Sequence, residues 1–269
     1  MSIDTTATNT GAATGANTGW PAPDPSRLTA GPTTVPLAEL RLAMIDVETS
    51  GLRPDRDRLL QIGLVRLTAA GVETDRWQTL LKAPWLPLRG RRIHGLSRRA
   101  LRGAPRFDSV MPELVAALDG HILCAHNIDF DWPFLRRALR RDGYEAPDAL
   151  RLCTLRLSRS LDPERTRSHR LPDVCQRYGV PLERAHDAGA DAIATASVLA
   201  PLLAEAGIVD VDGLRPHLEG TTTTWPSIAG EPRKPSWVRA LSLPDGSGPI
   251  DARWTGLADP LVPPGPPQP

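Results

Sequence analysis

The order of the apolar segments is the feature that most constrains the fold of this chain. Three runs of strand length come first, at residues 42–47, 59–67 and 76–81, and only short segments separate them. Strands joined by short turns pair antiparallel with their neighbours. The folded part is therefore expected to begin with an antiparallel three-strand meander.

After this meander, strands are expected to alternate with helices. Helices are predicted at residues 107–118, 132–141, 171–178 and 188–206, and short strands at residues 121–125 and 150–152. Such alternation is typical of parallel strands covered by helices. The sequence thus predicts a mixed α/β domain.

The two flanks differ from this middle part in composition. Residues 1–36 are dominated by Thr, Ala, Gly, Asn and Pro, and we expect a disordered leader there. Residues 208–269 are expected to form a largely irregular, Pro-containing tail, although its tryptophans predict that part of it packs against another surface. One catalytic domain is then expected at residues 37–207.

Cysteine usage and hydropathy favour a cytoplasmic protein. Cys124, Cys153 and Cys175 stand far apart among apolar neighbours, as small buried thiols do. No run of about 18 apolar residues and no signal-peptide pattern is found. The formal net charge is only +1, so attraction to a polyanion would have to come from an uneven charge distribution.

Two carboxylates stand at the end of the first expected strand. Because side chains alternate along a strand, Asp46 and Glu48 share one face, whereas Ile45 and Val47 point to the core. Neighbouring carboxylates repel each other unless a cation lies between them, and hard oxygen ligands favour Mg²⁺ or Mn²⁺. A solvated strand end is the alternative for so short a motif.

A second acidic segment, from His126 to Asp131, follows the strand expected at residues 121–125. It lies at the carboxyl end of that strand, where α/β folds place ligands. We expect Asp131 to be a metal ligand and Asp129 to cap the following helix.

A third segment combines His186 and Asp191 at the start of the Ala-rich helix expected from residue 188. Five positions are slightly more than one helical turn, so both side chains can reach the same cleft. A surface histidine or a hydrogen-bonded core histidine is the alternative for His186.

Together, the three segments resemble the DEDDh branch of the DnaQ-like 3′-5′ exonucleases, the family of the DNA polymerase III epsilon subunit. The matching positions are Asp46, Glu48, Thr49, Gly51 and Leu52, with Ser50 where threonine is usual; His126, Asn127, Phe130 and Asp131; and His186, Ala188 and Asp191. Residues 93–97 are similar to the Ile-His-Gly segment of that family. The resemblance covers about residues 37–206 and implies a ribonuclease H-like mixed sheet flanked by helices.

The resemblance also implies the chemistry. It implies a two-metal hydrolase that releases 5′-mononucleotides from single-stranded DNA, with His186 as general base. Two Mg²⁺ or Mn²⁺ ions would be held by Asp46, Glu48, Asp131 and Asp191. Substrate contacts are implied for Thr49, Ser50, Leu52, His94 and Asn127. An RNA-directed enzyme of the RNase T or oligoribonuclease type, and an inactive binding module, remain open alternatives, and a turn-capping role remains open for His94.

Arginines suggest where a nucleic acid would approach. One cluster surrounds the Ile-His-Gly segment and comprises Arg89, Arg91, Arg92, Arg98, Arg99, Arg102 and Arg106. A second comprises Arg136, Arg137, Arg140 and Arg141, and an ordinary solvated helix face is the preferred explanation for it. Residues 237–244 distantly resemble segments that dock on sliding clamps but lack the usual glutamine, so a polymerase or clamp contact through the tail is a weaker hypothesis.

Overall fold

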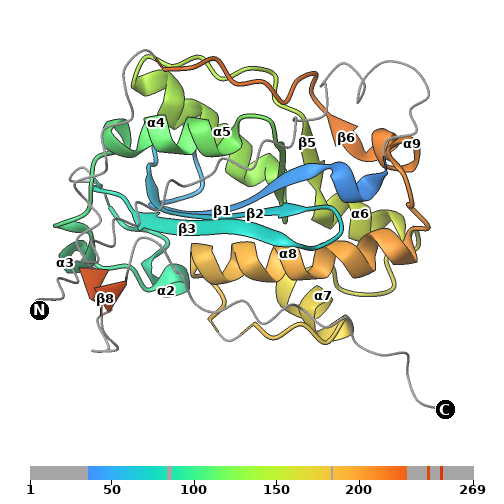
Figure 1. Ribbon diagram of the computed structural model, residues 1–269. Coiled ribbons are helices and arrows are strands. Elements are labelled where there is room, and N and C mark those ends of the chain that lie inside the picture. The colour runs from blue at the N-terminus through green and yellow to red at the C-terminus, as the bar shows by residue number, and fades with distance from the viewer. Residues whose placement is uncertain (1–35, 84–86, 183, 229–240, 243–248, 251–269) are drawn as a thin grey trace, which may run out of the picture.

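The computed structural model describes residues 36–83, 87–182, 184–228, 241–242 and 249–250 (Figure 1). Six of its strands form one sheet in the order β3-β2-β1-β4-β5-β6. These strands are β1 (Arg41–Thr49), β2 (Leu59–Thr68), β3 (Glu73–Leu80), β4 (Ile122–Ala125), β5 (Arg151–Cys153) and β6 (Leu218–Glu219). A separate short pair joins β7 (Leu241–Ser242) to β8 (Pro249–Ile250). The leader predicted before residue 36 lies outside the described residues.

The pairing of the strands confirms the predicted fold class. Strand β1 is antiparallel to β2, which is antiparallel to β3, as the short connections require. Strands β4 and β5 run parallel to β1, and β6 closes the far edge antiparallel to β5. Helices therefore connect the parallel strands, as in other mixed sheets of the ribonuclease H type.

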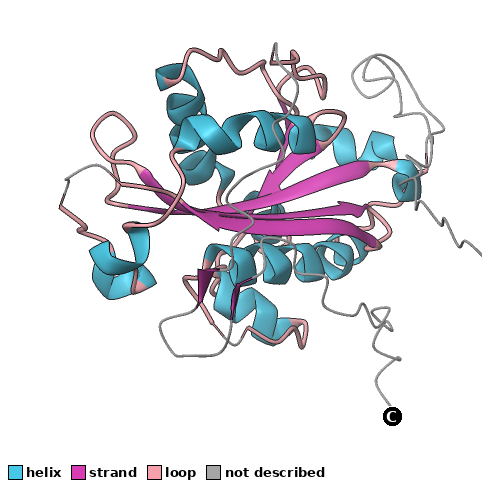
Figure 2. Ribbon diagram, turned by 60° about the vertical axis from the view of Figure 1, so that its left-hand side comes forward, coloured by secondary structure: helices cyan, strands magenta, loops and turns pink. Residues whose placement is uncertain are grey.

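Helices cover both faces of this sheet (Figures 1 and 2). One face carries α4 (Phe107–Leu118) and α5 (Ile128–Arg141), and the other carries α8 (Ala188–Glu205) with α6 (Thr154–Ser160) and α7 (Leu171–Arg177). Strand β1 serves both cores because its side chains alternate: Leu42 and Met44 pack on the α8 side, and Ile45 and Val47 on the α4–α5 side. The structure thus sandwiches β1 between two apolar layers.

Several short elements were not predicted. They are the 3₁₀ turns Leu37–Glu39 and Arg215–His217, the one-turn helices α2 (Arg91–His94), α3 (Arg98–Leu101) and α9 (Val211–Leu214), the helix α6, and the strand β6. Elements of one or two turns, or of two strand residues, bury too few side chains to show a helical or strand period in the sequence. The predicted start of α5 at residue 132 was wrong by one turn, since Asn127 is the N-cap in a left-handed conformation with φ 85°. Asp129 is consequently not the cap; it lies in the first turn and pairs with Arg156 at 3.3 Å.

Helix α8 is the one described helix that is long and apolar enough to span a bilayer, with a mean hydropathy of 1.2. It packs against β1 and β2, and its buried side chains belong to one of the two apolar cores. Its apolar character is therefore that of a core helix.

Part of the predicted tail packs on the domain. Trp225 is 3% exposed and lies between Trp132 and Tyr144, with ring centroids 6.2 and 6.4 Å away. Its backbone N–H donates to Asp119 Oδ1 at 2.8 Å. Ile208 and the α9 residues Val211 and Leu214 pack in the α8-side core, whereas Trp225 packs in the α4–α5-side core. Residues 208–228 therefore contribute to both cores, and we propose that the domain extends to about residue 228.

Replacing Trp225 with alanine is expected to cost about 3–5 kcal/mol of folding free energy, because a large buried ring leaves a cavity. Denaturant unfolding of the substituted chain would measure this loss. Truncation after residue 228 provides the control, since it keeps Trp225 and should leave the midpoint nearly unchanged. If truncation after residue 207 were equally harmless, the domain would end where the sequence pattern placed it.

Candidate active site

A cleft of about 690 Å³ opens at the carboxyl end of β1, bordered by the first turns of α5 and α8 and by α2. Nine of the predicted site residues line it: Asp46, Glu48, Thr49, Leu52, His94, Asn127, Asp131, His186 and Asp191. They come from segments that are far apart in the sequence. The fold therefore brings the three acidic motifs together in one cleft.

The first two carboxylates lie on β1. Asp46 and Glu48 are partly buried and continue the face that Leu42 and Met44 present to α8, while Ile45 and Val47 enter the opposite core. The alternation expected from the sequence thus gives the two carboxylates a common face at the strand end.

Asp131 reaches the same place from α5. Its side chain is 3% exposed, and its Oδ1 accepts a hydrogen bond from the Val47 backbone N–H at 3.1 Å. This bond ties the first turn of α5 to β1 between the two strand carboxylates. The positive end of the α5 dipole also favours an anion at this position.

Asp191 and His186 reach the cleft from the start of α8, on the opposite face of the sheet from α5. Asp191 lies in the first turn of α8, and its Oδ2 accepts a hydrogen bond from the His186 backbone N–H at 3.0 Å. His186 is exposed and holds a left-handed backbone with φ 68°. Single ligand atoms of Glu48, His186 and Asp191 lie within 4.8 Å of one another, a spacing that one metal ion can bridge.

The electrostatics of the cleft are those of a cation site. Burial and the neighbouring carboxylates raise the pKa of Glu48 to about 8 and that of Asp46 well above its ordinary value. Burial also raises the pKa of Asp131, to about 8, and that of Asp191. Asp191 Oδ1 is buried without a hydrogen-bond partner among the described residues. A cluster of hard, mutually repelling oxygen atoms with an unsatisfied acceptor fits Mg²⁺ or Mn²⁺.

The amino-acid sequence of this region matches a known family model. Residues 43–199, more than half of the chain, match the RNase_T model, described as an exonuclease. The chain belongs to the RNase_T exonuclease family. The matched range contains all three acidic motifs, and the family resemblance predicted from them is confirmed, as is the enzyme class at the level of the family.

Relatives of this exonuclease domain include larger proteins. The PolC-type DNA polymerase III of Bacillus cereus is 31% identical over 169 residues, which are 62% of this chain and 12% of that protein. The 3′-5′ exonuclease DinG of Bacillus subtilis is 29% identical over 165 residues, or 61% of this chain and 18% of DinG. The chain therefore spans less than a fifth of the length of these relatives.

Solved structures share the fold of the RNase_T domain. Exonuclease I of E. coli in complex with a dT13 oligonucleotide superimposes with a TM-score of 0.56 at 22% identity, over 62% of this chain and 42% of exonuclease I. A second exonuclease I structure gives a TM-score of 0.58 at 21% identity, over 66% and 44% of the two chains. Both likenesses confirm the mixed sheet.

The predicted substrate residues of the exonuclease domain differ in their surroundings. Leu52 is 79% exposed at the cleft, as a side chain that packs on a ligand would be. His94 Nδ1 accepts the Leu96 N–H at 3.0 Å, so the proton lies on Nε2, which is buried and faces the Thr49 backbone. Ser50 is fully buried and donates its hydroxyl to Asp57 Oδ1 at 3.1 Å. A contact from Ser50 to substrate therefore remains a prediction for its backbone alone.

The two arginine clusters of the exonuclease domain also differ. Arg89 of the first cluster lines the cleft, and Arg106 pairs with Asp108 at 3.0 Å. In the second cluster, Arg140 pairs with Glu145 at 2.9 Å, and Arg141 donates to the Pro54 carbonyl at 3.0 Å. Two of the four arginines in the second cluster thus have structural partners, which favours the solvated-face explanation.

Gln61 is a residue of the site that sequence reasoning missed. It is 5% exposed on β2, beside Glu48 in the pairing, and its Nε2 donates to Asp187 Oδ2 at 3.3 Å. Its Oε1 accepts the Ala188 N–H at 3.4 Å. The signal was a lone glutamine in the apolar stretch of residues 59–65. A buried amide needs hydrogen-bond partners, so a glutamine at such a position is expected to hold another segment in place. Gln61 thus fixes the start of α8 relative to β1. The site residues His186 and Asp191, which lie on either side of that helix start, are positioned with it.

Glycine permits this close contact of α8 with the sheet. A Cβ at Gly63 would lie 2.1 Å from the Ala188 carbonyl oxygen, so only glycine fits at this position. Gly63 pairs with Asp46 across the sheet. The backbone of β2 therefore supports the first turn of α8 next to the acidic site.

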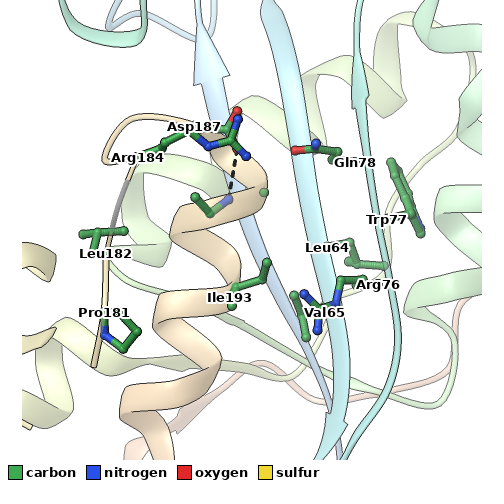
Figure 3. Close-up of a pocket in the computed structure, with 12 residues that line it drawn as sticks. Leu64, Val65, Arg76, Trp77, Gln78, Pro181, Leu182, Arg184, Asp187 and Ile193 are labelled. Atoms are coloured by element: carbon green, nitrogen blue, oxygen red, sulfur yellow. Dashed lines mark hydrogen bonds between the residues drawn. The ribbon is translucent and has the colours of Figure 1, made fainter. Parts of the chain in front are cut away.

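A smaller cavity of about 200 Å³ lies behind the His186 segment, between α8 and strands β2 and β3 (Figure 3). Asp187 stands at its rim, where its Oδ1 accepts the Ala190 N–H at 3.0 Å and caps α8. Its walls include Leu64, Leu182 and Ile193. None of the predicted site residues lines this cavity, so it is separate from the acidic cleft.

Metal ions are expected to stabilise this domain more strongly as the pH rises. Folding raises the pKa of Glu48 and Asp131 from their ordinary values to about 8, so the metal-free fold is favoured at low pH and loses stability as the pH rises towards 8. Saturating Mn²⁺ should therefore raise Tm by roughly 5–10 °C near pH 8, and less near pH 5. Thermal melts with chelator and with Mn²⁺ across this pH range would measure the difference. An equal shift at every pH would contradict a cation bound by these carboxylates.

Proposed function

We propose that this protein is a two-metal-ion 3′-5′ exonuclease of the DEDDh type that removes 5′-mononucleotides from single-stranded DNA. The observation that carries the proposal is the meeting of four carboxylates and one exposed imidazole in a single cleft. Exonuclease family membership supports the reaction class. No other arrangement in the described residues combines acidic clustering with an accessible base.

The proposed cation ligands are Asp46, Glu48, Asp131 and Asp191. Bound divalent ions would supply Lewis-acid activation of water and stabilise charge on the scissile phosphate and the leaving 3′ oxygen. Without ions, these side chains carry elevated pKa values that disfavour their charged forms. The ligands thus acquire full charge at neutral pH in the state that binds cations.

His186 is proposed as the general base that takes a proton from the attacking water. Its side chain is exposed at the cleft and within 4.8 Å of Glu48 and Asp191 ligand atoms. An imidazole has an ordinary pKa near 6.5, which suits proton transfer at neutral pH. Asp191 orients the segment by accepting the backbone N–H of His186.

The remaining cleft residues are proposed to hold the terminal nucleotide. Leu52 offers an exposed apolar surface for the base, and His94 borders the same cleft beside the Thr49 backbone. Thr49 and Asn127 border the same space. We expect these contacts to affect KM more than kcat, because they lie beside the reacting bond rather than on it.

DNA is proposed as the substrate because relatives carry the names of DNA polymerase III and E. coli exonuclease I, the latter bound to dT13. An epsilon-like proofreading role is a further proposal. The predicted clamp-binding segment falls mostly outside the described residues, so the tail contact remains a prediction, as does the cytoplasmic location.

Matched 5′-labelled single strands of DNA and RNA, incubated with Mn²⁺ or with chelator, test this function. A ladder that shortens from the 3′ end in Mn²⁺, is absent with chelator and is faster on DNA is the expected result. Faster loss of RNA would favour the RNase T or oligoribonuclease alternative. Binding without any hydrolysis would favour an inactive binding module.

A further inference from the structure

A second basin, of about 500 Å³, adjoins the acidic cleft. Its lining comprises His126, Asn127, Leu155, Arg159, Arg165, Ser168, His169 and Arg170. His126 and Asn127 also line the acidic cleft, so the two spaces meet at these residues. Among the residues that the structure describes, no carboxylate lines the basin, and Leu155 is its only apolar wall residue.

The three arginines of this basin differ from others nearby. Arg159, Arg165 and Arg170 are exposed, and none of them forms a side-chain ion pair with another described residue. In contrast, Arg156 pairs with Glu219 at 2.6 Å and Arg167 with Glu205 at 2.9 Å. The basin therefore carries uncompensated positive charge beside a cleft that is strongly acidic.

The loop that carries Arg165 and Arg170 is held by a buried network. Asp162 accepts hydrogen bonds from the Thr166 N–H and hydroxyl and from the Arg167 N–H, at 2.9–3.1 Å. Although burial opposes it, these bonds lower the pKa of Asp162, which stays ionised. The negative charge of Asp162 is therefore stabilised by hydrogen bonds within the loop. Its Oδ2 also accepts a hydrogen bond from His169 Nε2 at 3.1 Å.

The same network continues to the acidic cleft. Burial lowers the pKa of His126 to about 4, so its ring is neutral. His126 Nε2 donates to the His169 carbonyl at 2.9 Å, which leaves Nδ1 to accept from the Thr154 hydroxyl at 3.0 Å. His126 therefore joins the basic loop to Asn127 and to the start of α5. The basin is preorganised relative to the cleft.

We propose that this basin binds backbone phosphates of the nucleic-acid strand on the 5′ side of the scissile bond. The inference rests on the proposed function, because a 3′ end in the acidic cleft leaves only 5′ nucleotides to extend away from it. Guanidinium groups without partners bind phosphates without reading bases. The basin also offsets the repulsion that the acidic cleft exerts on an approaching polyanion.

The test compares two substrates and two double variants. Arg165→Gln with Arg170→Gln removes two charges of the basin, and Arg136→Gln with Arg137→Gln removes two exposed charges from α5. Arg159 is left in place because it lies in the last turn of α6 and stabilises that helix end. The substrates are a dT oligonucleotide and the p-nitrophenyl ester of thymidine 5′-monophosphate, which has no 5′-side phosphate beyond the reacting one.

For the basin variant, KM for the oligonucleotide should rise about 10-fold, and the slope of log KM against log salt should fall by about 1.4, for two lost contacts. Turnover of the nucleotide ester should remain within about twofold of the unsubstituted protein, as should both activities of the α5 variant. Equal losses on both substrates, equal losses in both variants, or an unchanged oligonucleotide KM would overturn the proposal. If the unsubstituted protein hydrolysed neither substrate, the proposed function itself would fail.

Discussion

Replacing Asp46 with asparagine is expected to lower kcat by about 10³-fold or more while the fold is retained. Asparagine keeps the shape of the side chain but removes a charge from the proposed cation site. Asp46 lies on β1 beside Glu48, and its side chain forms part of the cleft wall rather than of the apolar core. Steady-state hydrolysis of a labelled single strand in Mn²⁺ would measure the loss.

The same substitution should stabilise the metal-free protein at high pH. Burial and four neighbouring carboxylates raise the pKa of Asp46, so its ionisation costs folding free energy as the pH rises. Removing that group removes the cost, and Tm in chelator near pH 8 should rise by a few degrees, as about 1 kcal/mol implies. Glu145→Gln, an exposed carboxylate paired with Arg140, is the control and should change neither quantity. Full activity of Asp46→Asn would refute its role as a ligand.

Replacing His186 with asparagine is expected to lower kcat by about 10²–10⁴-fold, the usual contribution of a general base. Asparagine tolerates the left-handed backbone at φ 68° better than alanine, so the segment should keep its conformation. Because the imidazole is exposed at the cleft, added imidazole should partly restore turnover. His217→Asn, remote from the cleft lining, is the matched control.

Calorimetric titration with Mn²⁺ separates a base from a ligand at this position. A general base can be removed with little change in cation affinity, whereas a ligand cannot. His186→Asn should therefore bind Mn²⁺ nearly as well as the unsubstituted protein while turning over substrate slowly. A parallel fall in affinity and activity would assign His186 to the metal instead.

The sequence predicted the acidic site because its parts are local patterns at element ends. The alternation around Asp46 is visible within four residues, and the five-residue step from His186 to Asp191 is slightly more than the length of one helical turn. Each pattern predicts which way a side chain points. That the three segments meet followed from the family resemblance, and the cleft shows them together.

Other parts of the molecule depend on pairings that no local pattern encodes. Gln61 meets Asp187 across 126 positions, and His126 meets the His169 carbonyl across 43. Trp225 was expected to pack somewhere, but Tyr144 and Trp132 as its partners were not foreseeable from periodicity. Such contacts arise from tertiary packing, which composition and spacing do not determine.

The contact at Gly63 has a consequence for how this protein can vary. The gap between the strand half and the helix half of the acidic cleft is set by two main chains in direct contact at Gly63, and the Gln61 side chain holds them together. Apolar side chains farther along α8 can therefore be exchanged over evolutionary time with little effect on the dimensions of the cleft. One additional carbon at position 63 would push the first turn of α8 away from β2. Asp191 would then lie farther from Asp46, although every reactive group is still present.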